Sequence, residues 1–194
     1  MTELPGPHSR AGRILIGLHG RKGTGKDTVA LLLSRSYGFA RLSFAAPLKD
    51  MIAIGFGVRR ADFEGEAKEI VIPWIGKSPR ELLQSLGTEW GRERVAQDIW
   101  VRHAERRLAG QLRHRMRSVI TDCRFEDEAA WIRAQGGTVW HIERAAAPRG
   151  DLHASERGIG FFSTTDRAVP NDGTLQDLAD YVGGLMREYE DRAA

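Results

Sequence analysis

A glycine-rich segment near the start of the chain constrains its fold most strongly. Residues 20–28 read Gly-Arg-Lys-Gly-Thr-Gly-Lys-Asp-Thr, and they follow an apolar run at 13–18 that is typical of a buried strand. Residues 28–37 then have the apolar spacing of a helix, which Gly38 ends. This order indicates a phosphate-binding loop, because backbone N–H groups and a helix N-terminus would face one bound anion.

The loop departs from the common pattern at one position. Lys26 is expected to reach the β- and γ-phosphates of a nucleotide, but Asp27 stands where a hydroxyl usually follows, and Thr28 comes next. We therefore predict that Thr28 supplies the hydroxyl on the Mg²⁺ side. A loop of this type favours small-molecule and nucleoside monophosphate kinases over GTPases and motor ATPases. The predicted ATP-binding residues of the loop are Gly20, Lys22, Gly23, Thr24, Gly25, Lys26, Asp27 and Thr28.

Short apolar runs alternate with amphipathic segments along the rest of the chain. Further strands are expected at 39–44, 118–122, 138–143 and 167–170, and further helices at 48–54, 79–86, 98–113, 125–134 and from 174 onward. The alternation predicts an α/β three-layer sandwich with a five-stranded parallel sheet. We expect one domain over 13–194, with residues 1–12 as a flexible tail.

The charge balance alone does not indicate a nucleic-acid-binding protein. The chain has 29 Lys+Arg against 26 Asp+Glu, a formal charge of +3, and acidic residues interrupt the basic ones except in a denser stretch at 102–117. That stretch is either a solvated helix face or an anion-facing surface. A single cysteine, Cys123, excludes a disulfide framework and favours a packed core thiol. No run is long enough to cross a bilayer, so a cytoplasmic location is expected.

Charged residues follow the predicted strand at 118–122. Asp122 stands at its end, the position of a carboxylate that orders magnesium-bound water, although it could instead cap the helix beginning at Phe125. Arg124 lies two residues on and should point to the same side of an extended chain. Because ligands of parallel sheets bind at the carboxyl ends of the strands, both residues are candidates for a phosphate site.

Several segments together resemble one enzyme family. They are residues 17–28, Ser-Phe-Ala-Ala-Pro-Leu-Lys at 43–49, Arg-Glu-Leu-Leu-Gln-Ser-Leu-Gly-Thr-Glu at 80–89, Asp-Cys-Arg at 122–124, Asp-Leu-His-Ala-Ser-Glu at 151–156 and Asn-Asp-Gly-Thr at 171–174. The chain resembles the deoxynucleoside monophosphate kinases of tailed bacteriophages, within the P-loop nucleoside monophosphate kinase superfamily. The resemblance implies transfer of the ATP γ-phosphoryl group to a deoxynucleoside 5′-monophosphate (dNMP), with Mg²⁺.

The resemblance also assigns site residues. It implies a helical monophosphate-binding insertion at about 55–97, a lid at about 144–165 and a homodimer. The acceptor oxygen is already ionised at pH 7, so catalysis should rest on cations and positioning. The implied catalytic residues are Lys26, Arg80, Asp122, Arg124 and Arg144; the metal residues are Thr28 and Asp122. The implied dNMP-binding residues are Lys49, Arg80, Gln84, Thr88, Glu89, Arg124, His153, Ser155 and Glu156, and Asn171 and Gly173 join the ATP site.

Two other functions stay open on the sequence. A P-loop kinase of another small phosphorylated metabolite would carry the same loop and the same Asp122. A nucleotide-gated nucleic-acid-binding ATPase could use the basic stretch at 102–117, and its affinity for DNA or RNA would fall steeply with salt. If the protein is a kinase, ADP should form only when a monophosphate acceptor is present. Its partners are then expected to be small nucleotides, and neither a membrane nor a nucleic acid.

Overall fold

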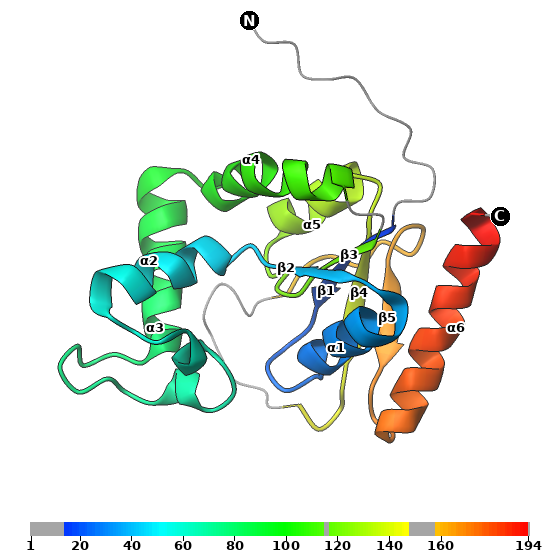
Figure 1. Cartoon of the computed structure of the whole chain (residues 1–194), viewed down its shortest axis with the longest axis horizontal. Helices are drawn as coiled ribbons and strands as arrows, with labels where there is room; N and C mark the ends of the chain where they lie inside the picture. Colours follow the sequence, from blue (N-terminus) through cyan, green and yellow to red (C-terminus); the bar gives the residue numbers. More distant parts are fainter. Residues whose placement is uncertain (1–13, 115–116, 148–157, 194) are drawn as a thin grey trace, which may run out of the picture.

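A parallel sheet forms the centre of the computed structural model, which describes residues 14–114, 117–147 and 158–193 (Figure 1). Every pairing between its strands is parallel, and their spatial order is β2-β3-β1-β4-β5. The strands are β1 (Ile14–His19), β2 (Ala40–Leu42), β3 (Arg117–Ile120), β4 (Thr138–Glu143) and β5 (Arg167–Pro170). The predicted five-stranded parallel sheet is therefore confirmed, and β4 and β5 have the predicted bounds.

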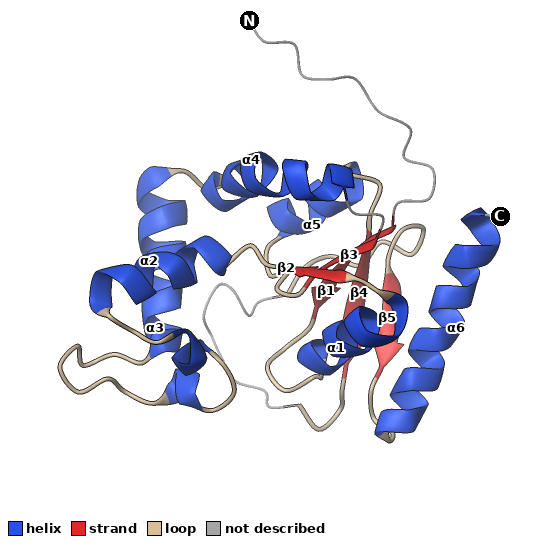
Figure 2. Ribbon diagram, in the orientation of Figure 1, coloured by secondary structure: helices blue, strands red, loops and turns tan. Residues whose placement is uncertain are grey.

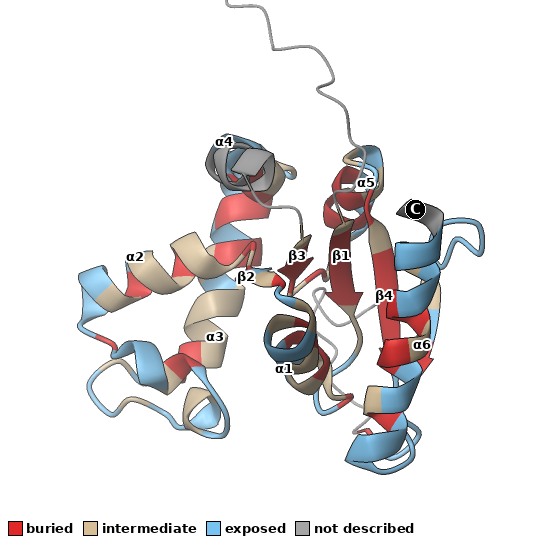
Figure 3. Ribbon diagram, turned by 45° about the vertical axis from the view of Figure 1, so that its right-hand side comes forward, coloured by how far each residue is buried: buried red, intermediate tan, exposed pale blue. Residues whose placement is uncertain are grey.

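Helices cover both faces of the sheet, as Figure 2 shows. The helices are α1 (Lys26–Tyr37), α2 (Ala46–Phe56), α3 (Pro79–Gln84), α4 (Ile99–His114), α5 (Glu126–Ala134) and α6 (Leu175–Ala193). Buried side chains of α1 and α6 pack on one face, and those of α4 and α5 pack on the other, which gives two apolar clusters. The sheet lies buried between them (Figure 3). This arrangement is the expected three-layer sandwich.

The continuous apolar sequence of β1 suits a strand that is covered on both faces. Its four central residues are all buried, as expected for the middle strand of a parallel sheet. Gly17 allows α5 to approach closely, because a Cβ at that position would overlap the side chain of Ile132. Cys123 lies in the same cluster as Ile132 and is 1% exposed, so it is a packed core thiol.

The strand order creates a crevice above neighbouring strands β1 and β3. The connection from β1 leads toward β2, whereas the connection from β3 crosses β1 to reach β4 on the other side. Connections that leave adjacent strands in opposite directions separate at the carboxyl ends of those strands. The phosphate loop follows β1 and Asp122 follows β3, so both candidate motifs lie at this crevice.

Residues 57–97 form a helical region that shares a small apolar cluster with α2. Two 3₁₀ turns, η1 (Arg60–Phe63) and η2 (Ala67–Glu69), precede α3, and a π-helical segment, η3 (Ser85–Val95), follows it directly. Ile52, Val58 and Phe63 form the buried centre of the cluster, and Leu82 and Leu83 pack against them.

The structure corrects several predicted bounds. The helix expected at 79–86 ends at Gln84 and continues as η3, whose wide turns include Gly87 and Gly91. Trp100 explains this locally: its indole Nε1 donates to the carbonyl of Gly87 at 2.6 Å, and a Cβ on Gly91 would overlap its ring. The first helix begins earlier than predicted, at Lys26. The strands expected at 39–44 and 118–122 are shorter, and they span 40–42 and 117–120.

Candidate active site

The phosphate loop joins β1 to α1 and depends on its glycines. Gly20, Gly23 and Gly25 have φ angles of 151°, 78° and 99°, a region that side chains with a Cβ rarely adopt. Gly25 is the N-cap of α1, and no side chain caps the helix there. The first N–H groups of α1 are thus directed to the crevice, as in a site for an anion.

The loop is held from within and from the last strand. Lys26 Nζ donates to the carbonyl oxygens of Gly20 and Arg21, the latter at 2.7 Å. Thr24 is buried, and its hydroxyl donates to the carbonyl of Arg21 at 2.9 Å. Asn171, which follows β5, donates from Nδ2 to the carbonyl of Thr24 at 2.7 Å. Asn171 therefore supports the loop main chain.

A cavity of about 440 Å³ opens at the carboxyl ends of β1 and β3, between the phosphate loop and the helical region at 57–97. Its volume is in the range of small-molecule sites. It brings together most of the predicted site residues. Those that line it are Lys22, Gly23, Gly25, Lys26, Asp27, Thr28, Lys49, Arg80, Gln84, Thr88, Asp122, Arg124 and Arg144.

Cations outnumber carboxylates in the cavity wall. Eight cationic side chains line it, against four carboxylates; the cations are Lys22, Lys26, Lys49, Lys68, Arg80, Arg92, Arg124 and Arg144, and the carboxylates are Asp27, Glu64, Asp122 and Glu128. A concave wall with this excess attracts polyanions. Apolar side chains such as Phe44, Leu48 and Phe63 line it as well.

Glutamates of the helical region contact three of the cations. Glu64 pairs with Lys49 at 2.8 Å. Glu69 lies 2.8 Å from Lys22 of the phosphate loop and 3.5 Å from Arg80 at the start of α3. Each pair includes an exposed or half-exposed carboxylate, so each contributes little to stability and is easily exchanged for another anion.

Asp122 holds the turn between β2 and α2. Its carboxylate accepts from Ser43 Oγ at 2.7 Å and from the N–H groups of Phe44 and Ala45, both at 2.9 Å. The alternative that Asp122 caps α5 is wrong, because Glu128 takes that position: its carboxylate accepts from the N–H groups of Arg124 and Phe125.

Some predicted residues do not line the cavity. Glu89 instead accepts from Ser85 Oγ at 2.6 Å on an exposed part of η3. Gly173 belongs to the turn before α6, where Asp177 accepts from Thr174. Gly20, Thr24 and Asn171 form or support the loop rather than the wall. His153, Ser155 and Glu156 lie outside the described residues, as does much of the segment predicted to be a lid.

Sequence reasoning missed other residues of the wall. Lys68, Arg92, Trp100, Phe125 and Glu128 all line the cavity. The side chains of Arg92 and Glu128 are only 7% and 5% exposed. Burial, the largest cause, raises the pKa of Glu128 to about 7, although the charge of Arg92 opposes the shift. No local pattern marks this pair, since 36 positions separate its members.

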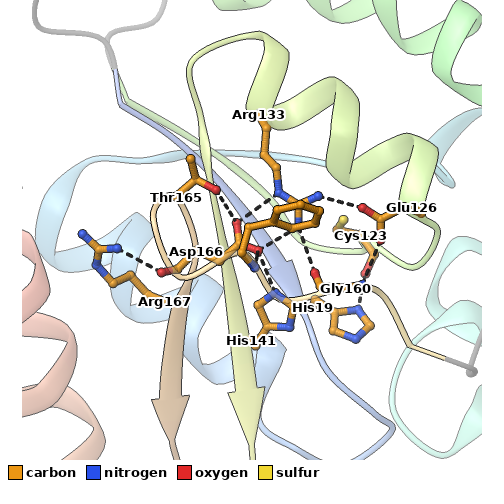
Figure 4. Close-up of polar contacts among 10 residues, drawn as sticks. His19, Cys123, Glu126, Arg133, His141, Gly160, Thr165, Asp166 and Arg167 are labelled. Atoms are coloured by element: carbon orange, nitrogen blue, oxygen red, sulfur yellow. Dashed lines mark hydrogen bonds and ion pairs between the residues drawn. The ribbon is translucent and has the colours of Figure 1, made fainter.

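A second polar cluster lies between α5, β4 and residues 160–167 (Figure 4). Arg133 binds both carboxylate oxygens of Asp166, at 3.1 and 2.7 Å, and also donates to Glu126 and to the carbonyl of Gly160. His141 lies 3.3 Å from Asp166. The cluster fixes residues 158–166 to α5 and β4.

His19, at the end of β1, is a neutral residue beside this cluster. Burial lowers its pKa to about 4, and the charges of Lys26 and Arg124 act in the same direction. Its ring lies edge-on to that of His141, with 5.2 Å between the centroids. Since a carbonyl can only accept, its Nδ1–H donates to the carbonyl of Cys123 at 3.0 Å.

Outside the cavity, Arg102 and Arg117 of the basic stretch form ion pairs. Arg102 pairs with Asp98 at 2.9 Å, and Arg117 pairs with Glu190 of α6 at 3.0 Å. Within the part of the chain that the structure describes, no helix has the length and apolar character needed to cross a membrane.

Comparison with known proteins identifies the family. Residues 67–182 match the family model described as "Deoxynucleotide monophosphate kinase". The chain is 32% identical to a putative deoxynucleotide monophosphate kinase of Acanthamoeba polyphaga mimivirus, over 85% of this chain and 92% of that protein. It is 25% identical to the deoxynucleotide monophosphate kinase of Enterobacteria phage T4, over 89% and 98%.

A solved structure supports the fold. The crystal structure of TT1252 from Thermus thermophilus aligns with 91% of this chain and 97% of its own, at 20% identity and a TM-score of 0.50. The predicted resemblance is confirmed by the family match and by the viral relatives. The chain, with its phosphate loop and cationic cavity, thus belongs to the deoxynucleotide monophosphate kinase family and is a nucleotide kinase.

Proposed function

We propose that the protein transfers the γ-phosphoryl group of ATP to a dNMP, giving a deoxynucleoside diphosphate and ADP. The observation that carries this proposal is the cationic cavity between the phosphate loop and the helical region at 57–97. Two phosphate-bearing ligands must meet for this reaction, and the lining cations come from both of these walls, from α2 and from the segments that follow β3 and β4. The family membership supplies the substrate class.

ATP occupies the wall formed by the phosphate loop. Lys26 exchanges its contacts with the loop carbonyls for the β- and γ-phosphates, and the N–H groups at residues 23–28 donate to the same phosphates. Asn171 and Gly173 act indirectly: Asn171 keeps the loop main chain in place, and Gly173 lets the chain turn into α6.

The dNMP occupies the opposite wall. Lys49 and Arg80 hold its phosphate, which replaces Glu64 and Glu69 as their anionic partners. Gln84 and Thr88 line the cavity farther along α3 and η3 and contact the sugar or the base. Roles for Glu89, His153, Ser155 and Glu156 stay predictions from the family resemblance.

The oxygen donors present suit Mg²⁺. This ion takes hard oxygen ligands and keeps several of its waters. Thr28 lines the cavity and would hold it together with the ATP phosphates. Asp122 already accepts three protein hydrogen bonds, so about one of its roughly four acceptor positions remains for a metal-bound water. When bound, Mg²⁺ supplies charge neutralisation on the β- and γ-phosphates.

Catalysis by this chain is positioning and charge stabilisation. An ionised oxygen of the dNMP phosphate attacks the γ-phosphorus while the bond to the β,γ-bridging oxygen breaks, and ADP leaves with that electron pair. No proton has to be removed from the acceptor. Arg80, Arg124 and Arg144 line the cavity and offset the negative charge that builds as the two phosphates meet.

A coupled ADP-release assay across deoxyribo- and ribonucleoside monophosphates tests the proposal. We expect ADP to form only when a deoxynucleoside monophosphate is present, and Lys26→Ala to lower kcat by at least about a hundredfold. Arg35→Ala is a matched control, since Arg35 is exposed in the last turn of α1, and it should keep wild-type activity. Turnover only with another acceptor, or ATP hydrolysis without one, would contradict the proposal.

The remaining expectations concern partners and location. The homodimer, the absence of nucleic acid as a partner and the cytoplasmic location stay predictions. Exposed apolar side chains on the helical region and α2, among them Ile54 at 86% and Trp74 at 71%, give the homodimer a candidate surface. Light scattering of the purified chain measures its oligomeric state directly.

A further inference from the structure

A buried ion cluster connects the helical region to the strand end that carries Arg124. Arg92, from η3, donates to Glu128 Oε1 at 2.8 Å, to Asp127 Oδ2 at 2.7 Å and to the carbonyl of Gln97 at 2.7 Å. Its guanidinium also lies over the ring of Phe125, 3.9 Å from the centroid. The elements it joins are far apart in the sequence.

The second oxygen of Glu128 holds a different part of the molecule. Oε2 accepts from the N–H of Arg124 at 2.8 Å and from the N–H of Phe125 at 3.1 Å. One carboxylate therefore binds the helical region through Oε1 and fixes the main chain of Arg124 through Oε2. Few other orientations of the turn after β3 would satisfy both contacts.

Both ends of this connection face the cavity. Arg92, Glu128, Phe125 and Arg124 all line it, in company with Thr88 of η3. Asp127 shares the Arg92 contact, but it is absent from the described cavity lining and makes no contact with the Arg124 main chain that the structure records.

Stability alone is a poor reason for such a cluster. Removing charges from water costs about as much as their attraction returns, so a buried ion pair often stabilises no more than apolar side chains of the same volume. A buried pair is better explained by a requirement for one defined geometry. Here that geometry sets the position of Arg124 relative to the dNMP wall.

We propose that Glu128 is a positioning residue for phosphoryl transfer, which holds Arg124 at the reacting phosphates and couples it through Arg92 to the dNMP wall. This inference rests on the proposed function, because it requires Arg124 to contact the transferred phosphoryl group. Both carboxylate oxygens of Glu128 are bound to protein donors. Its effect on the reaction passes through Arg124.

Glu128→Gln is the sharpest test. An amide has one acceptor oxygen, so its NH₂ group must face either Arg92 or the N–H groups of Arg124 and Phe125, and one connection is lost in either orientation. We expect kcat to fall by about tenfold to a hundredfold, the range for a misplaced catalytic group. The KM for ATP should change less than about twofold, because the hydrogen bonds that the structure records for Arg92 join it to Gln97, Asp127 and Glu128 and not to the phosphate loop.

Asp127→Asn is the matched control. It changes the neighbouring residue in the same way and weakens the same Arg92 contact, but it leaves the Arg124 main chain untouched. We expect its kcat to stay within about threefold of wild type. Should Glu128→Gln not fold, Glu128→Asp tests the same idea, since its shorter side chain keeps the charge but cannot span both contacts.

A double-mutant cycle with Arg124→Ala separates positioning from general loosening. If Glu128 acts through Arg124, adding Glu128→Gln to Arg124→Ala changes neither kcat nor the dNMP dissociation constant measured by calorimetry. The calorimetric reading remains available even if turnover is lost. Equal effects of Glu128→Gln in both backgrounds would overturn the inference. If instead the proposed function is wrong, the wild type itself will turn over no dNMP, so the two failures can be told apart.

Discussion

The two ends of α5 each carry an arginine–carboxylate cluster. In the first turn of α5, Glu128 and Asp127 bind Arg92 of η3, and in the last turn Arg133 binds Asp166. Both arginines bind carboxylates at under 3 Å, and each guanidinium lies over a phenylalanine ring, at 3.9 and 4.3 Å from the centroid. Yet the pKa of Glu128 is raised to about 7, mainly by burial, while that of Asp166 is lowered.

The number of donors accounts for this difference. Burial by itself would also raise the pKa of Asp166, but two N–H groups of Arg133 and the N–H of Phe162 outweigh it, with His141 and Thr165 adding further contacts. Glu128 accepts from fewer donors, namely one N–H of Arg92, which also binds Asp127, and the N–H groups of Arg124 and Phe125. An arginine contact alone therefore does not keep a buried carboxylate ionised. The Glu128 cluster faces the cavity, and the Asp166 cluster anchors residues 158–166.

The largest expected effect comes from removing the arginine that two acids share. Arg92→Met leaves Glu128 buried without its cation, and at pH 8 we expect a loss of about 3–5 kcal/mol in the free energy of unfolding. At pH 5.5 the loss should shrink, because Glu128 is then protonated. Urea denaturation at both pH values measures this, and an equal loss at both would contradict the raised pKa.

Arg133→Met should show a weaker dependence on pH. Its loss is expected to be about 2–4 kcal/mol, somewhat smaller because Arg133 is 13% exposed and Asp166 keeps other donors. The loss should change less between pH 5.5 and pH 8 than for Arg92→Met, since the wild-type Asp166 has a lowered pKa and the N–H of Phe162 still favours its ionised form in the variant. The same urea titration tests it. A loss that falls at pH 5.5 as steeply as for Arg92→Met would make the two clusters equivalent.

The titration of Glu128 should be visible in the wild type itself. Its folded pKa of about 7 exceeds the ordinary value of 4.5, so the folded protein holds more protons than the unfolded chain between these values. The free energy of unfolding should therefore fall as pH rises through this window, by about 1–3 kcal/mol. Glu128→Gln removes this contribution. The difference between the two proteins, measured from pH 4.5 to 8, should change only in that range.

His19 should produce a smaller contribution of the opposite sign. Its folded pKa of about 4 lies below the ordinary 6.5, so the unfolded chain takes up the proton first as pH falls. We expect His19 to cost the wild type about 1–2 kcal/mol at pH 4.5 relative to pH 7. His19→Gln, which keeps a donor for the carbonyl of Cys123, should remove this loss. NMR titration of the imidazole provides an independent reading.

The features that the sequence could predict are those in which the interacting residues are close together in the chain. The alternation of apolar runs predicted the sheet and its layers, and the residues at 20–28 predicted the loop between β1 and α1 that forms one wall of the cavity, because both signals are local. Arg80 was found through the family resemblance of the segment at 80–89, and it lies in the first turn of α3. Arg92 carried no such signal: its partners lie 35 and 36 positions away, and only the folded chain brings them together.

For two residues, Asp122 and Glu89, the sequence predicted the right segment of the chain but not the contacts of the side chain. Asp122 was placed at the right strand end, but its partners at 43–45 come from another connection. Glu89 belongs to a predicted segment, yet the π-helical turns of η3 change the spacing of side chains, and Glu89 lies outside the cavity wall. An α-helical repeat read from the sequence cannot anticipate that change.

The contact between Asn171 and Thr24 has a consequence for how the protein is made. It spans 147 positions, so the loop that begins near the N-terminus receives this support only after β5 has been synthesised and has docked beside β4. A chain still emerging from the ribosome would lack it. We therefore expect tight nucleotide binding to arise late in folding, so that ATP selectively stabilises chains whose last strand is in place.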